Sequence, residues 1–253
     1  MRSLRDMSIL ITGGGSGIGA GLAHHFAGRG AKVVISGRRS DKINAVASEI
    51  GPSCRAVAGD VTVPEDRKAL ISAVVEHGGG LDALINNAAN IVRGPITDIT
   101  EQDLLDIFHS NVVAGMMLTG LAVPHLERRQ GTVMFFGSVH TRRAFPGASP
   151  YAATKGALEA LTKVLAAELG PKRIRVNCVV PGAVLTEINQ RAGLFDDDTA
   201  AERLKSLAPA HVLGRIGTVE EIAEAVEYMI RAEWTTGAIL DVDGGLGLGL
   251  TNA

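Results

Sequence analysis

The chain has 253 residues, of which 46% are hydrophobic and 21% charged, and these proportions suit a globular protein with a sizeable core. Its net charge of -2 and its pI near 6.4 exclude the strongly basic proteins that bind nucleic acid or anionic membranes through charge. Cys54 and Cys178 stand far apart and match no metal-ligand or redox spacing, so we expect buried free thiols and no metal site.

The N-terminal residues lack the apolar core of a signal peptide, and no uninterrupted apolar run is long enough to cross a bilayer. We therefore expect a cytoplasmic protein with no membrane or nucleic-acid partner.

The first elements in chain order are a buried strand, a glycine-rich turn and a helix. Residues 7–12 form a short apolar run, which leads into the glycine-rich segment 13–19, and residues 20–27 have helical character. Glycines in this position let the backbone approach a pyrophosphate, and the helix N-terminus supplies N–H groups and a positive dipole end. The turn is therefore predicted to bind the phosphates of a nucleotide.

The alternation of strand and helix continues along the chain. Further strands are predicted at residues 32–36, 55–58, 82–86, 132–137, 175–180 and 238–242. Helices are predicted at residues 41–50, from 64 onward, at 104–125, from 151 to 169 and after Thr218. Alternating elements of this kind imply an α/β fold with a doubly wound parallel sheet of about seven strands and helices on both faces. Residues 1–253 contain no repeat or change in composition, so we expect a single domain.

Tyr151 and Lys155 lie one turn apart on the same face of a predicted helix. A free tyrosine has a pKa of about 10, and a positive charge held nearby lowers it. The pair therefore suits proton transfer near neutral pH. A tyrosine and a lysine at this spacing are also common as an ordinary surface pair, so the function depends on what surrounds them.

Other polar residues follow the predicted strands. Asn86 and Asn87, Ser138, and Thr186 lie at or just beyond strand ends, where ligands bind in this class of sheet. Asn111 differs, because it interrupts the apolar face of the helix at 104–125. A buried amide needs partners, and backbone carbonyls could supply them as well as a functional site could.

Four motifs together resemble the short-chain dehydrogenase/reductase family, and the resemblance extends from about residue 8 to residue 245. They are the loop Thr12-Gly13-x-x-x-Gly17-x-Gly19, the segment Asn86-Asn87-Ala88, the set Ser138, Tyr151 and Lys155, and the turn Pro181-Gly182-x-x-x-Thr186. The resemblance implies a Rossmann-type fold and an oxidoreductase. Such an enzyme transfers a hydride between a nicotinamide cofactor and a carbonyl or secondary alcohol.

The resemblance also implies a role for each residue of the site. Tyr151 would be the general acid in carbonyl reduction and the base in alcohol oxidation, and Lys155 would lower its pKa and hold the nicotinamide ribose. Ser138 would donate a hydrogen bond to the substrate oxygen, and Asn111 would hold a water that links Lys155 to solvent. Substrate contacts are expected from Ser138, His140 and Tyr151. Cofactor contacts are expected from Gly13, Gly15, Ser16, Gly17, Ile18, Gly19, Arg38, Arg39, Asp60, Val61, Asn87, Ala88, Tyr151, Lys155, Pro181, Gly182, Val184 and Thr186.

Two positions depart from the family pattern. Ala89 stands where the family usually has glycine, and Gly37 stands where members that prefer NAD(H) carry a carboxylate. Arg38 and Arg39 follow, and a guanidinium can bind a phosphate through paired hydrogen bonds. We therefore predict that NADP(H) is favoured over NAD(H), although both arginines could also be solvated loop residues.

The substrate is less well defined by the sequence. Its pocket is expected to draw on residues 90–94, residues 139–145 and a substrate-binding segment at 187–212. His140, Arg142 and Arg143 hint at a polar or anionic substrate, although surface exposure explains the two arginines equally well.

The resemblance fits several activities. They are reduction of a 3-oxoacyl thioester, broad ketone reduction, and NAD-dependent oxidation of a sugar or polyol. A dehydratase or epimerase fits less well, because such members usually have longer chains. A non-catalytic nucleotide-binding scaffold is the alternative from another class, but it would not need Asn111, Ser138, Tyr151 and Lys155 together.

The protein is also expected to be a homotetramer. The helices at 104–125 and 152–169 carry more apolar and small residues than one face of a sheet can cover, and the apolar tail at 244–250 would be unusual in solvent.

Overall fold

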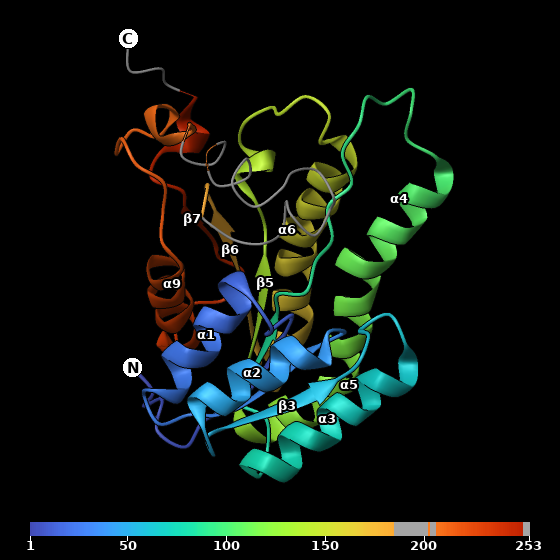
Figure 1. Cartoon of the computed structure of the whole chain (residues 1–253). Coiled ribbons are helices and arrows are strands. Elements are labelled where there is room, and N and C mark those ends of the chain that lie inside the picture. Colours follow the sequence, from blue (N-terminus) through green and yellow to red (C-terminus); the bar gives the residue numbers. More distant parts are fainter. Residues whose placement is uncertain (185–201, 203–205, 250–253) are drawn as a thin grey trace.

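The computed structural model describes residues 1–184, 202 and 206–249. Its centre is a seven-stranded parallel sheet in the order β3-β2-β1-β4-β5-β6-β7 (Figure 1). The strands are β1 (Ser8–Thr12), β2 (Lys32–Gly37), β3 (Cys54–Ala58), β4 (Ala83–Asn86), β5 (Thr132–Phe136), β6 (Arg175–Pro181) and β7 (Ile239–Val242). The predicted α/β fold is confirmed, and the chain forms a single Rossmann-type domain.

Helices cover both faces of the sheet. Those described are α1 (Gly17–Ala27), α2 (Ser40–Ile50), α3 (Pro64–Gly78), α4 (Glu101–Phe108), α5 (Ala114–Arg129), α6 (Ser149–Leu169) and α9 (Val219–Arg231). Apolar side chains of α1, α2 and α9 pack against one face, and those of α3, α5 and α6 pack against the other. The central strands are buried on both sides, which explains why they read as continuous apolar runs in the sequence.

The helix predicted at 104–125 is longer than expected and is interrupted. It comprises α4, a wide π-turn at His109–Val113, and α5. Thr100 begins it with a reciprocal capping box, in which Asp103 pairs with the backbone of Thr100. The π-turn contains Asn111, and wide turns of this kind often mark functional sites.

This long helix also bears on the predicted absence of a membrane span. Among the described residues, the helix Glu101–Arg129 is long and apolar enough to cross a bilayer by length and composition, and an 18-residue window within it has a mean hydropathy of 1.4. However, Leu118, Ala122 and Leu126 on this helix are fully buried in the core. The core helix of a soluble protein meets the same criterion.

The two cysteines are buried free thiols, as expected. Burial raises the pKa of Cys54 to about 11 and that of Cys178 to about 12, so neither thiol ionises near neutral pH.

Candidate active site

The glycine loop between β1 and α1 has a backbone that only glycine accommodates. Gly13 and Gly17 lie in the left-handed region, with φ values of +68° and +54°. A Cβ on Gly19 would overlap the carbonyl oxygen of Gly13. The absence of side chains at these glycines leaves the backbone of the loop accessible at the start of α1. The free N–H groups of a helix N-terminus bind anions, so the loop fits the pyrophosphate of a dinucleotide.

Thr12 and Asn87 join this loop to the loop that follows β4. The Thr12 hydroxyl accepts hydrogen bonds from the backbone N–H groups of Asn87 at 3.1 Å and Ala88 at 3.0 Å. In return, Nδ2 of Asn87 donates to the carbonyl oxygens of Thr12 at 2.9 Å and Gly13 at 3.1 Å. These residues of the predicted motifs therefore hold the two loops together across the middle of the sheet.

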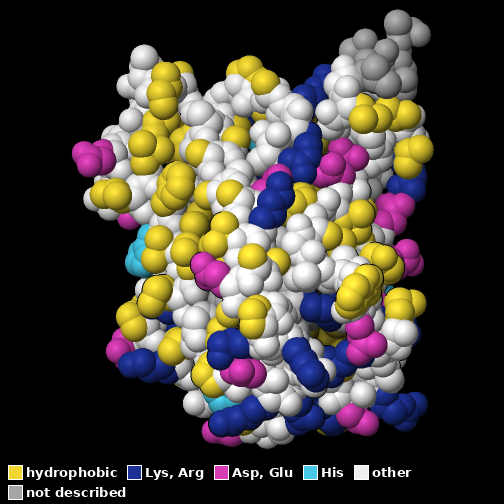
Figure 2. Space-filling model, turned by 180° about the vertical axis from the view of Figure 1, so that it is seen from behind, with side chains coloured by type: hydrophobic (Ala, Val, Ile, Leu, Met, Phe, Trp, Pro, Cys, Tyr) yellow, Lys and Arg dark blue, Asp and Glu magenta, His cyan; other side chains and the backbone are white. Residues whose placement is uncertain are grey.

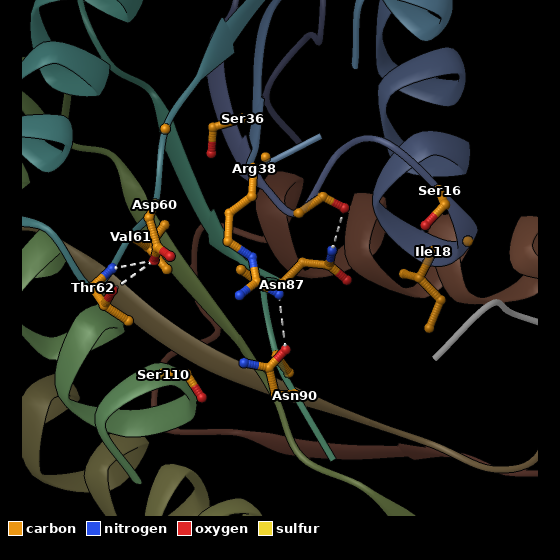
Figure 3. A pocket seen from close by; sticks show the side chains of 16 residues that line it. Ser16, Ile18, Ser36, Arg38, Asp60, Val61, Thr62, Asn87, Asn90 and Ser110 are labelled. Carbon is orange, nitrogen blue, oxygen red and sulfur yellow. Dashed lines mark hydrogen bonds between the residues drawn. The ribbon is translucent and has the colours of Figure 1, made fainter. Parts of the chain in front are cut away.

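A cleft opens beside these loops at the carboxyl ends of β1, β2, β3 and β4 (Figure 3). The residues predicted for the cofactor that line it are Gly13, Ser16, Gly17, Ile18, Arg38, Asp60, Val61, Asn87 and Ala88. The lining residues absent from that prediction are Ser36, Gly37, Gly59, Thr62, Ala89, Asn90 and Ser110. Most of these residues flank predicted residues at strand ends. The rule that ligands bind at the carboxyl ends of parallel strands could therefore have identified them. Ser110 could not be found this way, because the π-turn brings it to the cleft.

The end of β2 places two cationic side chains at the mouth of the cleft. Arg38 crosses the cleft, where its Nη2 lies 3.4 Å from Oδ1 of Asn90 (Figure 3). Nη2 of Arg39 lies 3.4 Å from the Ser16 hydroxyl. Both arginines are exposed. The fully buried Ser36 hydroxyl also lines the cleft and has no hydrogen-bond partner among the described residues.

Asp60, which follows β3, lies close enough to Arg38 to feel its charge. Burial would raise the pKa of its carboxyl, but hydrogen bonds from Thr62 and the charge of Arg38 outweigh that effect and lower it. Asp60 therefore stays ionised and holds the Thr62 turn at the edge of the cleft.

Ser138, Tyr151 and Lys155 come together where β5 ends and α6 begins. Nζ of Lys155 donates to the carbonyl oxygen of Phe136 at 2.9 Å and lies 5.4 Å from the centroid of the Tyr151 ring. Tyr151 and Lys155 are 8% and 3% exposed, so the cation and the phenol share a site that is largely closed to water. In such a site, each electrostatic interaction is stronger than in solvent.

The side-chain amide of Asn111 is fully engaged by protein groups. Its Oδ1 accepts from the backbone N–H of Asn90 at 2.7 Å and from the Ser110 hydroxyl at 3.1 Å. Its Nδ2 donates to the carbonyl oxygen of Asn90 at 2.9 Å and to the Thr154 hydroxyl at 3.1 Å. The water expected at Asn111 stays a prediction. Because the side-chain amide is fully hydrogen-bonded, such a water would have to bind another atom of this residue.

His140 lies between Ser138 and Arg93. Its Nδ1 is 2.9 Å from the Ser138 hydroxyl oxygen, its Nε2 is 3.3 Å from Nη2 of Arg93, and its ring meets Tyr151 edge to face. Burial and the charges of Arg93 and Lys155 lower the pKa of His140 to about 4, so the ring is neutral at physiological pH.

The hint that Arg142 binds an anionic substrate finds no support in its contacts. Its guanidinium forms ion pairs with Glu159 at 2.7 Å and Asp241 at 3.0 Å, so its charge is already matched within the protein.

The remaining predicted residues lie away from the cleft or outside the described chain. Gly15 packs on Ile43 of α2, and Gly182 lines a second cleft beside Asp243 at the end of β6. Pro181 ends β6, and Val184 forms an isolated bridge with Gly217. Thr186 and most of the segment 187–212 lie outside the described residues. In the described part of the chain, no group of three or more His, Cys, Asp or Glu side chains could hold a metal ion.

Comparison with known proteins gives a consistent picture. Residues 13–247 match a family model described as enoyl-(acyl carrier protein) reductase. Dehydrogenase/reductase SDR family member 4 of Sus scrofa is 35% identical over 96% of this chain and 88% of its own length. L-fucose dehydrogenase of Bos taurus is 36% identical over 95% of this chain and 89% of its own. The solved structure of a 3-ketoacyl-(acyl-carrier-protein) reductase from Brucella melitensis, complexed with NADH, superimposes with a TM-score of 0.87 at 32% identity. That match covers 97% of this chain and 100% of the other.

Replacing Gly19 with alanine should weaken dinucleotide binding, because the added methyl group forces the glycine loop away from its present path. Overpacking of this kind costs about 1–3 kcal/mol. We expect the dissociation constant of the reduced cofactor, measured by its fluorescence, to rise roughly ten- to hundredfold. Gly170→Ala is a matched control, since a methyl group there meets no neighbour within 4 Å. Unchanged affinity in Gly19→Ala would show that the loop does not bind the cofactor.

Proposed function

Since the chain belongs to the short-chain dehydrogenase/reductase family, we propose that it is an NADP(H)-preferring reductase of 3-oxoacyl thioesters or related ketones, with Tyr151 as the proton donor. Membership makes the protein an oxidoreductase that uses a nicotinamide cofactor and acts on a carbonyl or secondary alcohol. The proposal adds the identity of the catalytic groups, the preferred cofactor and the class of substrate.

The observation that carries the proposal is the buried cluster of Ser138, Tyr151 and Lys155. The bound cofactor supplies the hydride, and the chain's own residues manage the substrate oxygen. Ser138 donates a hydrogen bond to that oxygen as negative charge develops on it, and the Tyr151 hydroxyl donates the proton. The ammonium of Lys155 stabilises the negative charge left on Tyr151. In alcohol oxidation, Tyr151 accepts the proton instead. A non-catalytic scaffold would have no need of this arrangement.

The substrate class rests on the relatives. A 3-ketoacyl reductase with the same fold supports a ketone or thioester substrate, while the similarity to L-fucose dehydrogenase supports oxidation of a sugar or polyol. We propose that the segment 187–212 contributes to the substrate pocket. A cofactor-linked absorbance screen over acyl thioesters, ketones and polyols distinguishes the two classes, and turnover confined to polyols would overturn the reductase assignment.

The preference for NADP(H) rests on Gly37, Arg38 and Arg39. Gly37, at the end of β2, presents no carboxylate to repel a 2′-phosphate, and the two exposed guanidinium groups stand at the mouth of the cleft. A 2′-phosphate can accept paired hydrogen bonds from a guanidinium. The related reductase was solved with NADH, so this fold also accepts a cofactor without the 2′-phosphate, and we propose that the local charges decide the preference in this chain.

We also propose a homotetramer, because α4 and α5 leave apolar side chains uncovered. The large exposed hydrophobic side chains on this face are Leu105, Val113, Met116, Met117 and Leu121, between 37% and 57% exposed. Figure 2 shows hydrophobic side chains gathered along this side of the molecule, at the left of the view. Apolar surface of this extent is usually covered by a partner, and closed symmetry is the usual result.

The buried free thiols are compatible with the cytoplasmic location that we propose.

Tyr151→Phe should lower kcat by about 10²–10⁴-fold, the value of a positioned acid or base, while cofactor affinity remains nearly unchanged. The measurement is steady-state turnover of the best substrate from the screen, together with fluorescence titration of the reduced cofactor. If the variant keeps more than about a tenth of kcat with chemistry rate-limiting, Tyr151 is not the proton donor.

Arg38→Ala should raise the KM for NADPH by an amount equivalent to about 1.5–3 kcal/mol, because hydrogen bonds to the 2′-phosphate are lost. The KM for NADH in the same variant is the internal control and should barely change.

Gly37→Asp should shift the preference toward NADH, since a carboxylate repels the phosphate and accepts hydrogen bonds from the ribose. A higher kcat/KM with NADH than with NADPH in the unmodified protein would contradict this preference.

Light scattering at micromolar concentration should give a mass four times that of the 26.3 kDa chain. Met117→Glu should shift the mass toward smaller species, because it places a charge in the apolar face of α5 without touching the core. A monomer mass for the unmodified protein would exclude the tetramer.

A further inference from the structure

Ser138 is linked to Arg93 through the ring of His140. One ring nitrogen of His140, Nε2, lies 3.3 Å from the Arg93 guanidinium, and the other, Nδ1, lies 2.9 Å from the Ser138 hydroxyl oxygen. A guanidinium carries only N–H groups and can donate but not accept. Nε2 must therefore be the nitrogen without a proton. Because the ring is neutral, its single proton is on Nδ1, which donates to Ser138.

This arrangement gives the Ser138 hydroxyl a direction. A serine hydroxyl has one proton and two acceptor positions. The Nδ1–H of His140 takes one of these positions, and the backbone N–H of His140, at 3.4 Å, is directed at the same oxygen. The hydroxyl proton of Ser138 is therefore available for donation to another acceptor. The opposite ring tautomer would accept that proton and remove the donor from the site.

The surroundings hold the His140 ring in place. The Phe145 ring lies 4.5 Å away and the Tyr151 ring 5.2 Å away, measured between ring centroids. The charged groups that act on His140 are Arg93 at the Nε2 edge and Lys155 on α6, and both charges oppose protonation of the ring. His140 therefore remains neutral over the range in which nicotinamide-dependent enzymes work.

We propose that Arg93 and His140 are positioning residues, which hold Ser138 as a hydrogen-bond donor to the substrate oxygen by fixing His140 in its Nδ1–H tautomer. The inference rests on the proposed role of Ser138 and deepens it. Neither residue exchanges a proton with the substrate. They orient the Ser138 hydroxyl toward the substrate oxygen before negative charge develops on that oxygen. The hydroxyl therefore does not need to reorient during the reaction. A chain of aligned hydrogen bonds also polarises its last member.

The tautomer can be tested without any turnover. In protein labelled with ¹⁵N at histidine, the ring signals of His140 are identified by their loss in His140→Asn. We expect Nδ1 to be protonated and Nε2 unprotonated between pH 6 and pH 8, the reverse of the form that free histidine favours. Arg93→Leu should move the proton to Nε2 or give a mixture, whereas Arg128→Leu, an exposed arginine at the end of α5, should change nothing. An Nε2–H tautomer in the unmodified protein would overturn the inference whatever the enzyme's activity.

Kinetics test whether the link matters for catalysis. His140→Leu removes the donor to Ser138, whereas His140→Asn places an amide N–H close to the position of Nδ1–H. Removing one donor from an oxyanion site costs about 10²–10³-fold, so loss of its positioning should lower kcat roughly 10–100-fold in His140→Leu, with the KM for the cofactor little changed. His140→Asn should recover most of that loss.

A double-mutant cycle separates this effect from general damage to the site. In the Ser138→Ala background, His140→Leu should cause little further loss of kcat, because the group on which it acts is gone. An equal loss with and without Ser138, or no recovery in His140→Asn, would show that His140 acts by another route. Failure of the Tyr151→Phe prediction would leave the tautomer result standing, so the two hypotheses can fail separately.

Discussion

The hydrogen bonds between the loop after β1 and the loop after β4 are the constraint on which the site depends. The order of the sheet reverses between these neighbouring strands, so the two loops part and leave the cleft above them. Thr12 and Asn87 bridge this point with four hydrogen bonds, two in each direction. Without them, the glycine loop would lose its support from the loop after β4.

A second set of hydrogen bonds connects the loop after β4 to α6, the helix that carries Tyr151 and Lys155. Asn111 holds the backbone of Asn90 on one side and the Thr154 hydroxyl on the other, and Thr154 donates to the carbonyl oxygen of Tyr151. The amide thus connects the loop after β4 to the first turns of α6, and the π-turn allows it to point inward. Its satisfied hydrogen bonds stabilise the distance between the cleft and Tyr151, which explains an asparagine at this buried position.

The arginine side chains around the site lie in three different environments. Arg142 is neutralised by Glu159 and Asp241, so it stabilises the packing of α6 against β7 and not a ligand. Arg38 lines the cleft with its Nη2 3.4 Å from Oδ1 of Asn90, where we propose that it binds a phosphate. Arg93 instead faces a neutral imidazole, where a cation suppresses protonation of the ring. The three environments are therefore an ion-paired cluster, the cofactor cleft and the neighbourhood of a neutral imidazole.

The sequence by itself determined the order of strands and helices, the glycine loop and the pairing of Tyr151 with Lys155. These features follow from local rules, since buried parallel strands need apolar runs, the loop needs glycine, and residues four apart share a helical face. Only the tertiary structure decided the π-turn at Asn111, the ion pairs of Arg142 and the contact between Arg93 and His140. Arg142 and Asp241 are 99 positions apart in the chain, and Arg93 and His140 are 47 apart. No local pattern encodes such pairs, because their geometry exists only after the strands next to them in the chain have taken their places in the sheet.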